Sequence, residues 1–347
     1  MRATLKILIV GMVILFQLSS CFLDEPISYK ENQQTNTGNL LSPCTTGITN
    51  GPLMGGAVQG ILSLRGEGCN FINSSSSSGI EGITTDGVAL YFVSFDNTIR
   101  QVSLSTRLES IVAGSSGISG TTDGVGVNAR FSGPHVITTD GTNLYVTDFN
   151  AHTIRKIVIS SGIVTTLAGS SGISGTTDGT GTSATFSQPH GITTDGTNLY
   201  VTDLGGGTIR QVVISTGVVT TLASSSNFTS PIGITTDGTN LYVADASSNL
   251  IKKIVISTGV VTTFAGNGSS SVSDGIGINA SFDVPIGITT DGTNLFVVET
   301  KSNTVRKIVI STGVVTTIAS NLGNQDITTD GQRLYVTGNL NSINGID

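Results

Sequence analysis

One pentapeptide, Ile-Thr-Thr-Asp-Gly, occurs six times in the chain, and this repetition limits the fold more than any other feature. The spacings between successive copies, measured from one Asp to the next, are 54, 55, 42, 54 and 39 residues. Repeats of this length are typical of propellers and solenoids, whose units bury their apolar faces only against each other. The chain is therefore expected to consist mainly of six similar units. Their Asp residues are Asp86, Asp140, Asp195, Asp237, Asp291 and Asp330.

The sequence after each of the first five pentapeptides predicts three further β-strands. In the second unit these are residues 144–147, 153–159 and 163–168, which are rich in Val, Ile, Leu and Thr. Short turns with Asp-Gly or Thr-Gly, such as residues 140–143, separate the strands and tolerate a positive φ. No segment after residue 44 has a sustained helical period of apolar residues. We therefore expect an all-β domain built from units of four antiparallel strands.

Six four-stranded units at this spacing predict a six-bladed β-propeller, in which each blade is covered on both faces by its neighbours. A β-helix would need a shorter period, and a sandwich would not need six near-identical copies. The last unit, residues 327–347, has room for two strands and a third near 341–343, but for no fourth. An unclosed ring would leave an exposed strand edge. Residues 45–78 are therefore predicted to close the propeller by supplying the missing outer strand.

The details of the units resemble the NHL-repeat family. Its pattern of Pro-x-Gly-Ile, Tyr-Val-x-Asp and Asn-x-x-Ile-Arg-Lys-Ile is matched in part at residues 189–192, 200–203 and 208–210, and best at 145–155. A companion element, Asp-Gly-x-Gly-x-x-Ala-x-Phe, occurs at 123–131, 178–186 and 274–282. The resemblance covers about residues 80–347 and implies a six-bladed NHL-like propeller. It implies no particular activity, because this fold carries unrelated functions.

The first twenty residues are predicted to be a lipoprotein signal peptide. Arg2 and Lys6 precede an apolar run at 7–16, which is too short to span a bilayer. The following Leu-Ser-Ser-Cys at 18–21 resembles a bacterial lipobox, in which Cys21 becomes the lipidated first residue. The alternative is an ordinary signal peptide in which Cys21 has no role. Residues 21–44 are then a flexible tether, and 45–347 form the propeller, with the six repeats at 79–347.

The two remaining cysteines bear on the redox state of the compartment, and the net charge bears on nucleic acid as a partner. Cys44 and Cys69 could form a disulfide in an oxidising envelope, or they could remain free thiols. The chain has 16 Lys+Arg and 23 Asp+Glu, a net charge of -7, and removal of residues 1–20 would leave 14 against 23, or -9. This charge argues against nucleic-acid binding. We expect a lipid-anchored protein of the bacterial cell envelope. The outer membrane or cell surface is the favoured location, and the periplasmic face is the alternative.

In a propeller, the loops between blades and the loops joining second and third strands lie on the same face. That face is expected to gather His135, His190 and the carboxylates that end the second strands, at the mouth of the central channel. His135 and His190 could bind a metal, as His residues do in channels of some NHL-type enzymes. A zinc site, however, needs three or four protein ligands, and the next two units carry Ile232 and Ile286 instead. The four carboxylates are Asp148, Asp203, Asp245 and Glu299.

The favoured interpretation is therefore that both His residues open strands and that the carboxylates cap turns, with no metal or cofactor. The same reasoning applies to the Asp-Gly-x-Gly elements, whose Ala and Phe are expected to fill gaps between blades. Their three Asp residues could instead bind Ca²⁺, but one carboxylate per loop is a small ligand set. These residues are Asp123, Asp178 and Asp274.

No Ser/His/Asp or Cys/His arrangement stands out, so no catalytic residue is predicted. We expect a binding module for a protein or a glycan, displayed on the membrane through the lipid anchor. The alternatives are a metal-assisted lyase or hydrolase in the channel, and a purely structural component of the envelope. The ligand itself cannot be named from the sequence.

Overall fold

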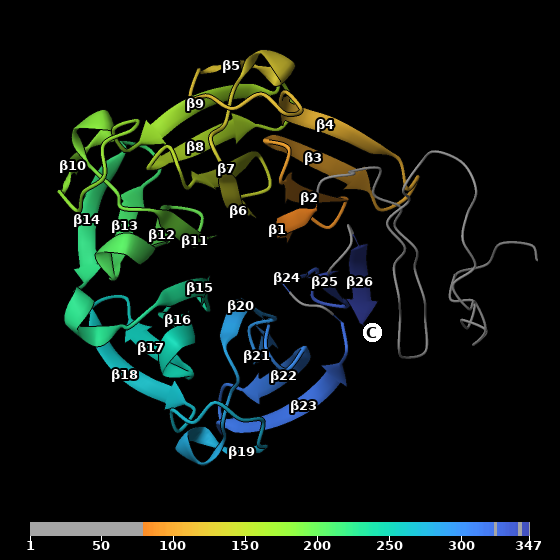
Figure 1. The fold of residues 1–347 in the computed structure, drawn as a ribbon, viewed down its shortest axis with the longest axis vertical. Helices are drawn as coiled ribbons and strands as arrows, with labels where there is room; N and C mark the ends of the chain where they lie inside the picture. The colour runs from red at the N-terminus through yellow and green to blue at the C-terminus, as the bar shows by residue number, and fades with distance from the viewer. Residues whose placement is uncertain (1–78, 323–324, 339–341, 347) are drawn as a thin grey trace, which may run out of the picture. The chain divides into compact units, whose positions relative to one another are not determined.

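The computed structural model describes residues 79–322, 325–338 and 342–346. In these residues six antiparallel sheets surround a central axis, and each sheet is one blade of a β-propeller (Figure 1). The predicted all-β, six-bladed architecture is therefore confirmed. The predicted signal peptide, the tether with Cys21, the pair Cys44 and Cys69 and the closing segment 45–78 lie outside the described residues.

Each blade is a meander that runs from the axis outward. The innermost strands carry the Ile-Thr-Thr of the repeat, and they are β1 (Ile80–Thr85), β6 (Pro134–Thr139), β11 (Pro189–Thr194), β15 (Pro231–Thr236), β20 (Pro285–Thr290) and β24 (Ile327–Thr329). The second strands are β2 (Ala89–Ser94), β7 (Asn143–Asp148), β12 (Asn198–Asp203), β16 (Asn240–Asp245), β21 (Asn294–Glu299) and β25 (Leu334–Gly338).

The outer half of each blade is made by the next two strands. The third strands are β3 (Thr98–Ser103), β8 (Thr153–Val158), β13 (Thr208–Val213), β17 (Leu250–Val255), β22 (Thr304–Val309) and β26 (Ser342–Ile346). The fourth strands of blades 1 to 5 are β4 (Glu109–Gly114), β9 (Ile163–Ala168), β14 (Val218–Ala223), β18 (Val260–Ala265) and β23 (Val314–Ser320). Blade 6 has three strands among the described residues, as its length predicted.

Blades 2, 3 and 5 have a short fifth strand, which the sequence analysis did not predict. The Asp-Gly-x-Gly element supplies it and pairs it with the outer edge of the following blade. These strands are β5 (Gly124–Val125), β10 (Gly179–Thr180) and β19 (Gly275–Ile276), each followed by a 3-10 turn, η1 (Gly126–Asn128), η2 (Gly181–Ser183) or η6 (Gly277–Asn279). Three further 3-10 turns lie in loops, η3 (Leu204–Gly206), η4 (Ser225–Asn227) and η5 (Ala246–Ser248).

The repeated Asp residues stabilise the first turn of each blade. Asp140 Oδ1 accepts the backbone N–H groups of Thr142 and Asn143 at 2.8 and 2.6 Å. Its Oδ2 accepts the hydroxyl of Tyr145 at 2.8 Å, so the carboxylate joins the turn to the second strand. Gly141 follows at φ 84°, a conformation that costs a residue with a Cβ much more than it costs glycine.

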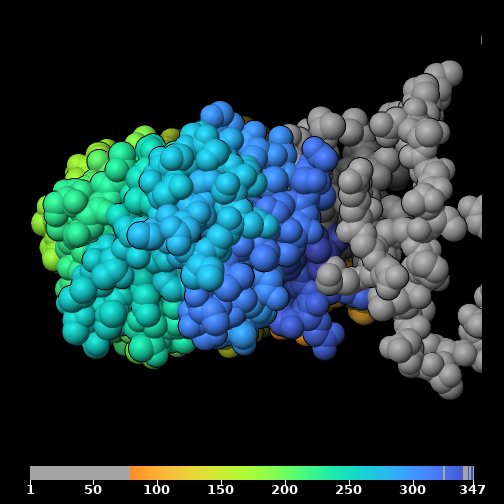
Figure 2. Space-filling model, turned by 90° about the horizontal axis from the view of Figure 1, so that it is seen from below, coloured from red at the N-terminus to blue at the C-terminus, as the bar shows by residue number. Residues whose placement is uncertain are grey.

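The apolar core lies between blades rather than within them. Phe131, from the Asp-Gly-x-Gly element after blade 1, is fully buried and packs in one cluster with β2 and β3 of blade 1 and with β6 and β7 of blade 2. Phe186 and Phe282 are also fully buried at the equivalent positions, as expected for residues that fill the gaps between blades. In the space-filling view, blades 4 and 5 form a continuous surface on the face shown (Figure 2).

Blade 6 contacts blade 1 and thereby closes the inner part of the ring. The hydroxyl of Thr337 in β25 donates to the carbonyl of Glu81 in β1 at 3.1 Å. Thr147 and Thr202 make the same bond to the following blades, so the closing junction repeats the ordinary contact between blades. On its outer side, β26 pairs with no strand of the described residues. The predicted closure of the outer edge by residues 45–78 stays a prediction.

Candidate functional site

A central cavity of about 190 Å³ lies on the propeller axis and is the candidate site. All six innermost strands contribute to its wall, together with the two residues before β24. One level of the wall is a ring of six threonines, contributed once by each blade. These are Thr84, Thr138, Thr193, Thr235, Thr289 and Thr328.

A β-bulge in the innermost strands brings two levels of side chains into this cavity. In β6 the pairing register shifts between Pro134 and Ile137, and β1, β11, β15 and β20 shift at the same place. His135 and Thr138 are three residues apart, so a regular strand would direct them to opposite faces. The extra residue of a bulge changes this alternation, and both residues line the cavity.

The second level, two residues before the Ile of Ile-Thr-Thr, is where the copies differ. Blades 4 and 5 carry Ile232 and Ile286 there, while blades 1, 2, 3 and 6 carry polar residues. The four polar residues are neighbours around the ring, so one arc of the cavity mouth is polar and the opposite arc is apolar. The polar residues are Glu81, His135, His190 and Gln325.

The polar arc contains a carboxylate and two imidazoles in direct contact. His135 Nε2 lies 2.9 Å from Glu81 Oε1, and these side chains are 24% and 15% exposed. The ring of His190 lies 4.3 Å from that of His135, measured between centroids, and Phe149 packs against His135 at 4.9 Å. The Nδ1 atoms of both His residues are buried and have no hydrogen-bond partner among the described residues. The contact with Glu81 and the ring packing therefore hold the pair in place.

Burial and the neighbouring His135 lower the pKa of His190 to about 3. The imidazole of His190 is consequently neutral at physiological pH.

Asp326, directly before β24, adds a second carboxyl group to the cavity wall. Its Oδ2 accepts the backbone N–H of Ile83 at 3.0 Å, which links blade 6 to blade 1. A Cβ at Gly287 would lie 2.7 Å from Val298 Cγ2 and 2.9 Å from the Cα of Asp326, so glycine at this position lets the residues before β24 approach β20 closely. Burial raises the pKa of Asp326 to about 7, and the charge of Glu81 acts in the same direction. The N–H groups of Ile83 and Ile327 and the charge of His135 oppose this rise.

The structure brings His135 and His190 together, as the sequence analysis expected of adjacent blades. Glu81 and Asp326 were missed, although an alignment of the innermost strands would have shown that both depart from the repeat. In the described parts of the chain, no group of three or more His, Cys, Asp or Glu side chains is arranged to hold a metal ion. No helix within those residues has the length and apolar character needed to cross a bilayer.

The carboxylates at the ends of the second strands do not line the cavity, in contrast to their expected place at the channel mouth. They are buried inside their own blades, each less than 2% exposed, and they bind backbone N–H groups or arginine side chains. They are Asp148, Asp203, Asp245 and Glu299.

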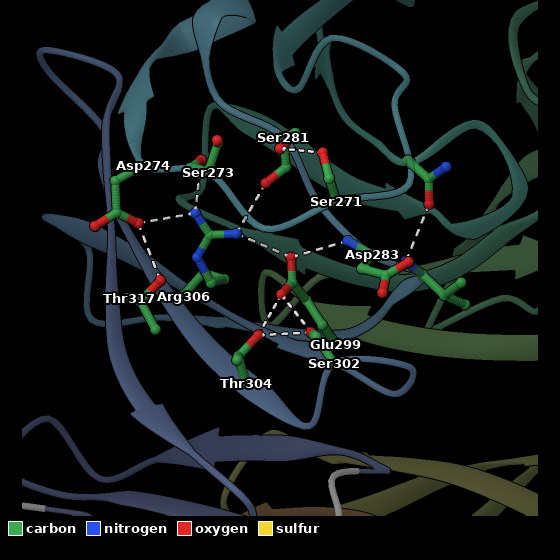
Figure 3. A network of polar contacts seen from close by, with 12 residues as sticks. Ser271, Ser273, Asp274, Ser281, Asp283, Glu299, Ser302, Thr304, Arg306 and Thr317 are labelled. Carbon is green, nitrogen blue, oxygen red and sulfur yellow. Dashed lines mark hydrogen bonds and ion pairs between the residues drawn. The ribbon is translucent and has the colours of Figure 1, made fainter.

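Blade 5 shows this arrangement clearly (Figure 3). Arg306 Nη1 donates to Glu299 Oε1 at 3.1 Å and to the carbonyl of Ser281 at 2.9 Å. Its Nη2 donates to Asp274 Oδ1 at 3.0 Å, and Asp274 also accepts the hydroxyl of Thr317. Asp274 therefore serves an ion pair, and the same is true of Asp123 with Arg155 and of Asp178 with Arg210.

Blade 2 has the same network around Asp148. Burial raises the pKa of Asp148 to about 6, while the charge of Arg155 and the N–H of Ser132 oppose that rise. Asp245 in blade 4 differs, because it accepts the backbone N–H groups of Thr229 and Ser230 and has Lys252 where blades 1, 2, 3 and 5 have arginine.

His152 lies outside the cavity. It has a positive φ of 61°, like Asn249 and Asn303 at the same position of their loops. Its Nδ1 accepts the backbone N–H of Gln188 in the linker that enters blade 3, at 3.0 Å. His152 therefore joins two blades.

Comparison with known proteins agrees with the fold and the repeat. No family model matches the chain. NHL repeat-containing protein 2 of Homo sapiens is 32% identical over 157 residues, which are 42% of this chain and 22% of that protein. The chain thus matches only about a fifth of the length of this relative.

Solved structures of low identity share the architecture. A chain of the nidogen/laminin complex aligns with a TM-score of 0.57 at 17% identity and covers 83% of this chain and 96% of its own. An auxiliary nutrient binding protein from Bacteroides thetaiotaomicron has a TM-score of 0.56 at 14% identity, with 77% and 68% covered. A catalytically inactive virginiamycin B lyase from Staphylococcus aureus has a TM-score of 0.52 at 19% identity, with 76% and 78% covered. These identities show the fold alone.

Proposed function

We propose that this NHL-repeat β-propeller is a lipid-anchored binding protein of the cell envelope, and that the mouth of its central cavity contacts the partner. The observation that supports this best is that the residues which differ from the other copies of the repeat lie together. Glu81, His135, His190 and Asp326 replace the Ile or Gly of other copies, and all four meet in one cavity. A scaffold needs no such cluster, because blades 4 and 5 are formed with Ile232 and Ile286 at the same level.

The interactions of the acidic residues outside the cavity support the same conclusion. In blades 2, 3 and 5 the carboxylates that end the second strands are neutralised by arginines inside the blade. These ion pairs stabilise the blades. Glu81 and Asp326, in contrast, line a cavity that a ligand can enter. An auxiliary nutrient binding protein and a chain of the nidogen/laminin complex, both with this fold, are compatible with a binding role. The anchor through Cys21 is part of the proposal.

A reverted variant tests the function. Glu81→Ile together with His135→Ile and His190→Ile restores the residue that blades 4 and 5 already accommodate at this level, so the propeller should still fold. Parent and variant are immobilised and exposed to envelope proteins and glycans, and the bound material is identified by mass spectrometry. Loss of a specific partner from the variant is the expected result.

The matched control is Lys156→Gln on β8, because blade 3 carries Gln211 at the equivalent position. This variant should retain the partner. If the reverted variant captures the same material as the parent, the cavity mouth is not the binding surface.

A further inference from the structure

The described cavity wall contains acidic side chains but no Lys or Arg to neutralise them. Among the described residues these acidic side chains are Glu81 and Asp326. Glu81 contacts His135, which is charged only when protonated, and no described Lys or Arg forms an ion pair with Asp326. A buried carboxylate is stable only when it is paired or well hydrogen-bonded. A cationic ligand would therefore be favoured here.

The apolar arc of the mouth favours an alkylammonium group over a metal ion. Ile232 and Ile286 face the polar arc at the same level, and aliphatic groups offer nothing to a metal ion. An alkylammonium group would use both arcs, since its nitrogen needs carboxylates and its methylenes need apolar contacts. The ring of His190 is neutral, and its Nδ1 has no hydrogen-bond partner among the described residues. It therefore offers a further contact surface for methylenes and does not repel a cation.

The size of the cavity agrees with such a ligand. Its volume of about 190 Å³ is far above the ~15 Å³ that a cavity needs to hold one water molecule. The butylammonium end of a lysine side chain has five non-hydrogen atoms, so it fits this space while the rest of the ligand stays outside the mouth.

We propose that the cavity binds the ammonium end of a lysine side chain presented by a protein partner. The nitrogen would lie between Glu81 and Asp326, and the methylenes would pack against Ile232 and Ile286. This inference rests on the proposed binding function and names the chemical class that the same cavity recognises.

Binding should be linked to the release of a proton. The pKa of Asp326 is raised to about 7, so part of the population must lose its proton before Asp326 can pair with an ammonium group. The other titratable groups of the cavity wall are Glu81 of β1, His135 of β6 and His190 of β11, while β15 and β20 add none. Affinity is therefore expected to increase from pH 5 to pH 8.

The three histidines of the chain make a direct test possible, because two lie in the cavity and His152 lies outside it. Nα-acetyl-lysine methylamide is titrated into the full chain at pH 8 while the histidine Cε1–H resonances are followed by NMR. Single His→Gln variants assign the signals. The resonances of His135 and His190 should shift saturably, with a Kd on the order of 1 mM. His152 should not shift.

Two comparisons identify the ammonium group as the feature that is bound. The same probe acetylated on its side-chain nitrogen should bind at least tenfold more weakly. Glu81→Gln and Asp326→Asn should each weaken binding of the free amine at least tenfold, whereas Asp123→Asn, an equal change of charge outside the cavity, should not.

The fold of both cavity variants is controlled by melting them beside the parent. In Asp326→Asn the introduced amide oxygen could still accept the Ile83 N–H, and Glu81→Gln leaves that bond untouched. Equal binding of the two probes, or no saturable shift, would overturn the proposal.

A partner captured through the cavity mouth separates this inference from the proposed function. If acetylation of the partner's lysines abolishes capture, both hold. If capture survives acetylation, or if the partner is a glycan, the binding function stands and the ammonium class is wrong. If the lysine probe binds while no partner is captured, the ammonium site stands and the proposed function is wrong.

Discussion

Arg155 Nη2 lies 2.8 Å from Asp123 Oδ1, and this contact joins blade 2 to the linker that arrives from blade 1. The other guanidinium nitrogen, Nη1, lies 3.1 Å from Asp148 Oδ2, and the guanidinium carbon is 5.2 Å from the centre of the Phe131 ring. In blades 2, 3 and 5 the Asp-Gly-x-Gly element and the Arg of the repeat are thus two halves of one contact. Blade 4, which no such element precedes, has Lys252 instead of Arg.

This contact predicts that Arg155→Met is strongly destabilising. The substitution leaves Asp148 fully buried without its counter-ion, which should cost about 3–5 kcal/mol in the free energy of unfolding. Urea denaturation measures the loss. Lys252→Met at the equivalent position of blade 4 is the control, and it should change stability by less than about 0.5 kcal/mol, because Lys252 Nζ only donates to Thr263 near the surface. Equal losses would mean that the ion pairs contribute nothing.

Asp326→Asn should change the pH dependence of stability. The folded-state pKa of Asp326 is about 7, above its ordinary value of 3.8, so the folded protein keeps a proton that the unfolded chain has released between these values. Stability from this group is therefore present at low pH and is lost as pH rises through 7. Asn mimics the protonated form, so the variant should gain more in Tm over the parent at pH 8 than at pH 5. A difference independent of pH would contradict this assignment.

Thr337→Val should weaken the junction between blades 6 and 1. The substitution removes the hydrogen bonds to the Glu81 carbonyl and from the Asp326 N–H, at a cost of about 1 kcal/mol. Val fits at this position of the repeat, since blades 1 and 5 carry Val93 and Val298 there. Thr337→Ser keeps the hydroxyl and should recover most of the loss in a thermal melt. If Ser is as destabilising as Val, the methyl packing and not the bond matters.

Deletion of residues 45–78 should destabilise the whole ring cooperatively, because β26 has a free outer edge in the described structure. Thermal melts would compare this deletion with the mature protein and with a deletion of 22–40, which should have little effect. A 45–78 deletion that melts like the parent would show that the outer edge is closed in another way.

Cys21→Ala should abolish lipid labelling and partitioning into the detergent phase, because Cys21 is the acceptor in the lipobox-like sequence. Labelling with a lipid precursor and phase separation measure both effects. Partitioning that is unchanged in the variant would show that the sequence is not a lipobox.

The amino-acid sequence by itself determined the architecture of this protein. Six copies of Ile-Thr-Thr-Asp-Gly, the first five each followed by three apolar strands and the last by two, specify six blades, because each blade must bury both faces against equivalent neighbours. The Asp-Gly turns and the three-stranded last blade were also predictable, since turn chemistry and strand length depend on residues close in sequence.

Only the tertiary structure decided which polar residues share a site. Asp148 and Asp326 are both acidic residues of the repeat region, but the first is neutralised inside a blade by Arg155 and the second lines the cavity near Glu81. Asp326 belongs to blade 6 and Glu81 to blade 1, so they are neighbours only because the ring closes. A bulge in the innermost strands then decides which residues face the axis, and no period of the sequence records where a strand is irregular.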